Sequence, residues 1–174
     1  TRSRTGCRLG RPEATTRLSK KDTVAVTVGS TAPGFTLPGW YDGLAEFGLA
    51  QRRGNATVLV FYPGDERLVC TRQLCTYSDN ISDLHLFDAV VWGISPQSIE
   101  SHRDFAGARK LKMPLLTDSD GEVARAYGIV GPLGVRRSVF VLDANGVIAW
   151  RKITALGVSF PTTQEIRDAL QNLR

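Results

Sequence analysis

Long apolar runs are missing from this chain of 174 residues. None of its apolar stretches approaches the ~20 consecutive residues that a helix needs to span a bilayer. The basic start of the sequence is not followed by the apolar core of about 7–15 residues that marks a secretory signal. We therefore expect a cytoplasmic protein without a membrane partner.

Cysteine and histidine are also scarce. The three cysteines, Cys7, Cys70 and Cys75, are too few and too unevenly spaced for the disulfide framework of a small secreted protein. A reducing compartment, in which thiols do chemistry rather than cross-link the fold, fits this composition better. The two histidines, His85 and His102, lack the spacing of a structural zinc site, and so do the cysteines. We expect no bound metal and interpret both histidines as residues of helix surfaces.

The positive charge of the chain is concentrated at its start. Residues 1–22 hold seven Lys or Arg and two acidic residues, which accounts for the whole net charge of +5. The remaining residues are electrically balanced, which argues against nucleic acid as a partner. Because residues 1–22 have almost no large apolar side chains, we expect a disordered basic tail ahead of one domain at residues 23–174. The Arg, Ser and Thr content of the tail resembles an organellar transit peptide, although a loose basic extension explains it more simply.

Apolar and β-branched runs mark the expected strands. They lie at residues 24–27, 57–62, 89–94, 114–116, 138–142 and 147–150. The run at 57–62 is continuously apolar, so we expect a central strand that is covered on both faces. Asn145-Gly146 lies between the last two runs, and this dipeptide is typical of a tight β-hairpin.

Helices are expected at residues 44–51, 70–87, 98–111, 122–127 and 163–173. Ser98 and either Thr162 or Thr163 are candidate N-caps, and the acidic stretch at 118–122 caps the fourth helix. Strands and helices alternate early in the chain, which implies parallel pairing, and the late hairpin adds antiparallel strands. We therefore predict an α/β protein with a thioredoxin-like fold, in which a mixed central β-sheet carries helices on both faces.

Cys70 and Cys75 carry the strongest chemical signal in the sequence. The strand at 57–62 ends at Pro63-Gly64 and a helix-compatible stretch follows, so Cys70 is expected in the first turn of a helix. Unpaired backbone N–H groups and the positive end of the helix dipole favour a thiolate there. A second thiol five residues further on favours redox chemistry over the alternative, a small buried hydrophobic residue.

Residues 61–65 and 69–71 resemble the peroxidatic loop of peroxiredoxins, and Cys75 stands where one group of that family has its resolving cysteine. This group is that of the bacterioferritin comigratory protein and peroxiredoxin Q. Other stretches resemble the group in the same order, at residues 32–37, 93–98, 101–105, 114–118, 126–129 and 137–143. The resemblance covers about residues 24–173, and its collinear length makes it specific.

The resemblance implies reduction of hydrogen peroxide and organic hydroperoxides. Cys70 would attack the peroxide bond and become a sulfenic acid, and Cys75 would condense with it to a disulfide that thioredoxin or a similar dithiol reduces. Arg137 matches the family's active-site arginine, which would hold thiolate and peroxide, and Pro63 would shield the thiolate. Arg136 would point to solvent from the other side of the strand. The family's chemistry needs no metal and no organic cofactor, and we expect a monomer or a weak homodimer.

Arg67 departs from the family pattern, in which Thr or Ser stands three residues before the peroxidatic cysteine and contacts the peroxide. Arginine has no acceptor atom and cannot reproduce the role of a hydroxyl group. Leu68 stands where the family often has proline. A catalytically weakened redox sensor or chaperone of the same fold is therefore the alternative function.

Two further classes stay open from the residues alone. A thiol–disulfide oxidoreductase normally has Cys-x-x-Cys, whereas four residues separate Cys70 from Cys75. A metal-binding module would have to assemble its ligands from these two cysteines together with Cys7, His85 and His102, which are scattered along the chain.

Overall fold

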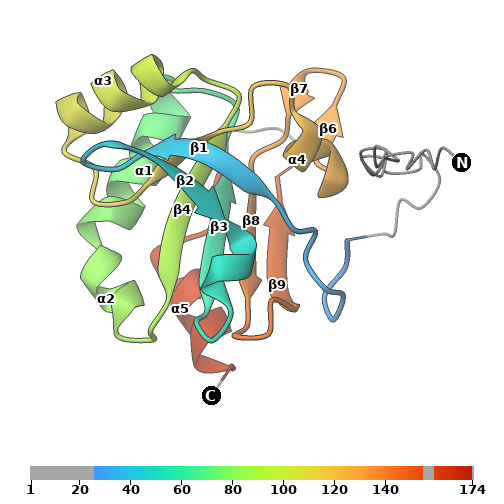
Figure 1. The fold of residues 1–174 in the computed structure, drawn as a ribbon. Coiled ribbons are helices and arrows are strands. Elements are labelled where there is room, and N and C mark those ends of the chain that lie inside the picture. The colour runs from blue at the N-terminus through green and yellow to red at the C-terminus, as the bar shows by residue number, and fades with distance from the viewer. Residues whose placement is uncertain (1–25, 155–158, 174) are drawn as a thin grey trace, which may run out of the picture.

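A seven-stranded mixed sheet forms the centre of the protein in a computed structural model, which describes residues 26–154 and 159–173 (Figure 1). Its strands are β1 (Thr36–Trp40), β2 (Leu44–Gly48), β3 (Thr57–Phe61), β4 (Val90–Ser95), β5 (Leu115–Thr117), β8 (Ser138–Leu142) and β9 (Ile148–Ile153). They lie in the order β2-β1-β5-β4-β3-β8-β9. The central strands β3, β4 and β5 run parallel, and the other pairings are antiparallel. A separate small hairpin is made of β6 (Val130–Gly131) and β7 (Gly134–Val135).

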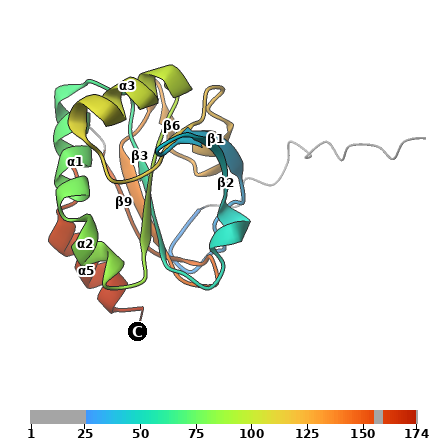
Figure 2. The same ribbon diagram turned by 60° about the vertical axis from the view of Figure 1, so that its left-hand side comes forward.

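Helices cover both faces of this sheet, as predicted. They are α1 (Leu68–Asp79), α2 (Ile81–His85), α3 (Ile99–Arg109), α4 (Glu122–Ala126) and α5 (Thr163–Gln171), with a 3-10 helix η1 (Leu49–Arg52). Side chains of α1, α2, α3 and α5 share one core with one face of the sheet, and α4 and η1 contribute to the core on the other face. Figure 2 shows α1, α2 and α5 together on one side of the strands. The predicted α/β, thioredoxin-like architecture is confirmed.

Strand β3 divides the two cores because its side chains alternate between the faces of the sheet. Val58 and Val60 belong to the core under α1, whereas Leu59 and Phe61 belong to the opposite core. All five residues of β3 are buried, which agrees with the continuously apolar run in the sequence. Burial of apolar surface on both faces stabilises this strand. The loop between β3 and α1 therefore begins at a firmly held residue.

Side chains at the predicted capping positions accept hydrogen bonds at the starts of three helices. Ser98 accepts a hydrogen bond from the backbone N–H of Ser101 at 3.2 Å. Thr162 forms a capping box with Glu165 at the start of α5. The carboxylate of Asp118 accepts from the first turn of α4, at 2.8 Å from the nitrogen of Ala124. These side chains satisfy backbone donors that a helix start leaves unpaired.

The predicted helix at 44–51 is wrong. Residues Leu44–Gly48 form strand β2, which pairs with β1, and the helical part is limited to η1. Asp42 adopts a positive φ of 54° and Gly43 one of 157°, so these residues form the tight turn between the two strands. An Asp-Gly turn is a strong hairpin signal, and the strand pairing it directs outweighs the helix-compatible composition of the segment.

Other boundaries also differ from expectation. The single helix expected at 70–87 is interrupted at Asn80, where the backbone leaves the helical conformation and α2 begins. The strand expected at 24–27 lies partly outside the described residues, and Val26 and Thr27 are not in a strand. The predicted basic tail and Cys7 lie outside the described residues. Within the residues that are described, no helix has both the length and the apolar character needed to cross a membrane.

Candidate active site

Cys70 lies in the first turn of α1, directly after the loop that leaves β3. Arg67 is the N-cap of this helix, and its carbonyl oxygen accepts from the backbone N–H of Thr71 at 2.8 Å. Glu66 has a positive φ of 58°, which reverses the chain between the strand and the helix. The Cys70 side chain is 0% exposed and belongs to the core under α1. A thiol at this place faces the positive end of the helix dipole, as the sequence predicted.

Arg137 brings a buried positive charge to this thiol. Its Nη2 donates a hydrogen bond to Sγ of Cys70 at 3.2 Å, and the residue is 3% exposed. The pairing of β3 with β8 explains this contact, because Phe61 and Ser138 are direct partners at the ends of the two strands. Arg137 therefore reaches the site from the strand next to the one that leads to Cys70. The sulfur of Cys70 and the guanidinium of Arg137 are therefore in direct contact and are both buried.

Gln73 contacts Arg137 directly and Tyr77 contacts Gln73, and the sequence analysis named neither residue. Oε1 of Gln73 accepts a hydrogen bond from Nη1 of Arg137, and Gln73 is 0% exposed. The Tyr77 hydroxyl donates to the backbone oxygen of Pro161 at 2.6 Å, and lies 3.4 Å from Nε2 of Gln73. Burial raises the pKa of Tyr77 above its ordinary value. Gln73 follows Cys70 by three residues, and this helical spacing was a readable signal for a second site residue.

A second polar group lies on the other side of the loop and centres on Asp65. Its Oδ1 accepts from the Tyr62 hydroxyl at 2.8 Å. Its Oδ2 accepts from the Ser101 hydroxyl at 2.7 Å and lies 2.9 Å from Nδ1 of His102. Burial alone would raise the pKa of Asp65, but the hydrogen bonds from His102 and Ser101 outweigh it and lower that pKa. Burial, and then the neighbouring charge of Asp65, raise the pKa of Tyr62 well above its ordinary value.

The structure corrects one expectation about histidine. His102 was predicted on a helix surface, but it is 0% exposed and both of its ring nitrogens lie near oxygen atoms. Nδ1 faces Asp65, and Nε2 lies 3.2 Å from the backbone oxygen of Leu116. A buried partner for the imidazole exists only because the loop after β3 brings a carboxylate against α3. His85 is exposed, as predicted.

Cys75 lies on the same helix as Cys70, and both thiols are free. Residues five apart in an α-helix have Cα atoms roughly 8–9 Å apart. A disulfide requires Cα atoms within about 7 Å, so the two sulfurs cannot bond while α1 is intact. Cys75 is partly buried, and this burial raises the pKa of its thiol. It is therefore protonated at neutral pH.

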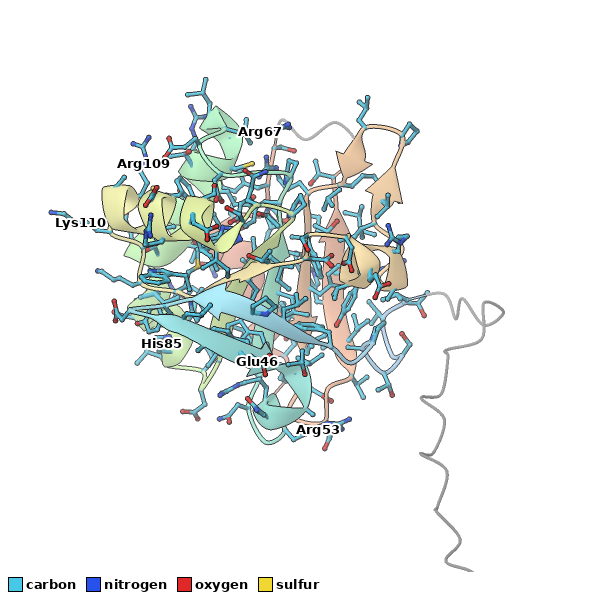
Figure 3. The ribbon with its side chains drawn as sticks, turned by 45° about the horizontal axis from the view of Figure 1, so that its top comes forward. Glu46, Arg53, Arg67, His85, Arg109 and Lys110 are labelled. Carbon is cyan, nitrogen blue, oxygen red and sulfur yellow. The ribbon has the colours of Figure 1, made fainter. Side chains whose placement is uncertain are left out.

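A cavity of about 420 Å³ opens beside Arg137. Its lining consists of Pro63, Arg67, Arg136, Arg137, Thr154 and residues 131–135 of the β6–β7 hairpin. Figure 3 shows Arg67 at the start of α1, at the top of the view. Arg136 is exposed, as predicted, and its Nη2 donates to the backbone oxygen of Gly128 at 3.0 Å. No acidic side chain belongs to this lining, which combines three arginines with Thr154 and with apolar and glycine residues.

The residues needed for a metal site do not come together in the part of the chain that the structure describes. Among residues 26–154 and 159–173, no three His, Cys, Asp or Glu side chains are grouped so that they could hold a metal ion. The arrangement that is present is a buried thiol, a buried guanidinium at hydrogen-bonding distance and a second thiol on the same helix. Such a site suits nucleophilic thiol chemistry.

Comparison with known proteins identifies relatives of this chain. The model of the AhpC/TSA family matches residues 28–151. The chain is 40% identical over 126 residues to chloroplastic peroxiredoxin Q of Sedum lineare, covering 71% of this chain and 67% of that protein. It is 29% identical over 161 residues to peroxiredoxin Bcp of Bacillus subtilis (strain 168), covering 87% of this chain and 97% of that protein. The crystal structure of peroxidoxin BcpB from Mycobacterium tuberculosis matches with a TM-score of 0.73 and 26% identity, over 84% of this chain and 97% of that one.

Proposed function

Because this chain belongs to the AhpC/TSA family and is a peroxiredoxin, we propose that it reduces hydroperoxides with Cys70 as the nucleophile and Cys75 as the resolving thiol. It is a peroxidase by family, and the roles of individual residues are our proposal. The observation that supports them best is the 3.2 Å contact between Nη2 of Arg137 and Sγ of Cys70. In this proposal, the guanidinium beside the sulfur would hold both the thiolate and the incoming peroxide.

In the first step, the Cys70 thiolate attacks the nearer oxygen of the peroxide. The S–O bond forms as the O–O bond breaks, and the departing oxygen takes up a proton and leaves as an alcohol or as water. Negative charge moves from sulfur to this oxygen, and Arg137 would stabilise that charge in the transition state. Sulfur is oxidised to the sulfenic acid and the peroxide is reduced. Pro63 lines the cavity beside Arg137, where it would shield the sulfur from bulk water.

In the second step, the sulfur of Cys75 attacks the sulfur of the Cys70 sulfenic acid, and the Cys75 thiol loses its proton as it does so. The disulfide forms and the hydroxyl group leaves as water after it takes a proton. Both cysteines belong to α1, so the first turns of this helix must unwind before the sulfurs meet. Thioredoxin or a similar dithiol would then reduce the disulfide by thiol–disulfide exchange.

Single-turnover and steady-state kinetics of two cysteine variants test this proposal. Cys70→Ser should abolish peroxide reduction, because an alcohol is scarcely ionised at neutral pH and is a poor nucleophile. Cys75→Ser should consume about one equivalent of peroxide, stop as the sulfenic acid and proceed to the sulfinic acid with excess peroxide. Cys7→Ser is the matched control and should retain turnover with a thioredoxin system. If Cys75→Ser turns over as fast as the unmodified chain, then Cys75 is not the resolving thiol.

A weakened redox sensor or chaperone is the second candidate, because Arg67 stands where a hydroxyl group is expected. The same kinetics separate the two functions. A peroxidase oxidises Cys70 rapidly and turns over with its reductant, whereas a sensor reacts slowly and stays oxidised. Sustained rapid turnover with thioredoxin would rule out the sensor.

A further inference from the structure

A buried polar cluster ties the loop before Cys70 to helix α3, and the two chemical steps proposed above make no use of it. This Asp65 cluster consists of Tyr62, Asp65, Ser101 and His102. Two of its members belong to the loop that follows β3, and two belong to the first half of α3. It therefore joins two segments that are otherwise separate in the chain.

Burial makes this attachment strong. The side chains of His102 and Asp65 are 0% and 2% exposed. A carboxylate in such a place is tolerated only while its hydrogen bonds are made, because burial removes it from water. Its three partners lie at 2.7 to 2.9 Å, which are short distances typical of hydrogen bonds to a charged group. The loop cannot leave α3 unless Asp65 gives up its bonds to Ser101 and His102 together.

The cluster also lies at the place where it can control Cys70. Asp65 is two residues before Arg67, the N-cap of α1, and five before Cys70. Fixing Asp65 therefore fixes where the helix begins and how its first turn is directed. Glu66 adds an ion pair with Arg109 of α3 at 3.1 Å, but this pair is exposed and contributes little. The attachment of the loop to α3 therefore depends mainly on the buried carboxylate of Asp65.

The geometry points to the Asp65 cluster as a latch that holds Cys70 in the helix, against Arg137, and that must release before Cys70 can reach Cys75. His102 is its main positioning residue. The second half of this inference rests on the proposed role of Cys75. A weaker latch has opposite effects on the two steps: Cys70 meets peroxide in a less ordered site, so the sulfenic acid forms more slowly. The helix opens more often, so the disulfide then forms faster.

Two substitutions at one position separate the latch from simple space filling. In His102→Asn, the side-chain amide nitrogen occupies the place of Nδ1 and keeps the hydrogen bond to Asp65. In His102→Gln, the amide nitrogen occupies the place of Nε2 instead, so it keeps the bond to Leu116 and loses Asp65. Asparagine is the smaller residue and leaves the larger void. A latch predicts that Gln is the more damaging change, and a space-filling role predicts that Asn is.

Amide hydrogen exchange of the reduced protein provides the first measurement. His102→Gln should raise exchange at residues 64–71 by a factor of roughly ten or more, as expected for loss of a hydrogen bond to a charged group. His102→Asn should stay close to the unmodified chain, and so should exchange in β3 and β8 of both variants. Equal exchange at residues 64–71 in the two variants, or faster exchange in His102→Asn, overturns the latch. If His102→Gln does not fold, Ser101→Ala removes another of the three bonds and should raise exchange in the same segment.

Single-turnover kinetics provide the second measurement. In His102→Gln, oxidation of Cys70 by hydrogen peroxide should slow while the rate of disulfide formation rises, and less sulfinic acid should accumulate. Rates that fall together overturn the latch. The exchange measurement involves no peroxide, so it stands or falls independently of the proposed chemistry. If exchange rises as expected while no disulfide with Cys75 forms, then the latch is supported and the proposed resolving step is wrong.

Discussion

Nη2 of Arg137 and Sγ of Cys70 lie 3.2 Å apart, although the two residues are 67 positions apart in the chain. The sheet makes this contact, because β3 leads into the Cys70 helix and its antiparallel neighbour β8 begins one residue after Arg137. Each strand therefore delivers one member of the pair to the same end of the sheet. The electrostatic part of the site is built into strand pairing rather than into a loop.

Arg137→Ala should slow oxidation of Cys70 by hydrogen peroxide by about 100-fold or more, as for other contacts that stabilise charge in a transition state. Stopped-flow measurement of sulfenic acid formation is the direct assay. Arg125→Ala is the control, since Arg125 is exposed on α4 and does not line the cavity beside Arg137, and this variant should react close to the normal rate. An unchanged rate in Arg137→Ala would remove this residue from the site.

Gln73→Leu should reduce the same rate by about tenfold, because Arg137 loses the buried acceptor that fixes its direction. The effect should disappear in the Arg137→Ala background, since Gln73 acts through the arginine. A double-mutant cycle measures this coupling. Independent, additive effects would show that Gln73 has another role.

Arg67→Thr tests the unusual residue at the N-cap of α1. Threonine is a better N-cap than arginine and supplies a hydroxyl group near the thiol, so peroxide reduction should rise or stay unchanged. The rate constant for hydrogen peroxide is the measurement, and Arg72→Thr on the exposed side of α1 is the control. A large fall confined to Arg67→Thr would show that this arginine works in the site.

Oxidation should unwind the start of α1. Because both sulfurs lie on this helix, disulfide formation should lower helicity and raise amide exchange between about residues 65 and 79, while the sheet changes little. Cys75→Ser treated with one equivalent of peroxide is the control, and its helix should stay folded. Identical exchange in the oxidised and reduced chain would refute a catalytic disulfide between Cys70 and Cys75.

Acid should weaken the attachment of the loop through Asp65. The pKa of Asp65 is lower in the folded chain than in the unfolded chain, so ionisation of Asp65 favours folding. This contribution is fully present above the unfolded pKa, which is about 4, and is lost as pH falls through the lower folded pKa. The free energy of unfolding should therefore fall more steeply with acid in the unmodified chain than in Asp65→Asn. Parallel curves between about pH 4 and pH 2 would contradict this assignment.

The parts of the fold that could be predicted from sequence are those with local signals. The apolar run of β3, the Asn145-Gly146 hairpin and the Ser98 cap each depend on residues within one segment. The helix predicted at 44–51 is wrong because the composition of the segment suits a helix, whereas the adjacent Asp42-Gly43 turn directs it into a strand. Local composition is a weak constraint once a turn has directed a strand to its partner.

Among the site residues, too, those with local signals could be predicted and those that depend on distant partners could not. Cys70 could be placed in a first helical turn from the strand and turn that precede it, and the helical spacing of Gln73 could have added a third residue. The burial of His102 could not be predicted, because its partner Asp65 is 37 residues earlier in the chain. A lone polar residue in a helix is ordinarily solvated, and only tertiary structure shows otherwise.

The register of β3 against β8 has a consequence for how this chain can change in length during evolution. Side chains alternate along a strand, so one residue inserted between Arg137 and β8 would turn the guanidinium to the opposite face of the sheet. At the far end of the same strands, the 143–146 turn accepts hydrogen bonds from Ala32, Arg53 and Gly54, which lie outside the site. We therefore expect insertions and deletions to be tolerated at the 143–146 turn and to be excluded at the end where β8 begins. The lengths of these two segments should vary to different extents among related sequences.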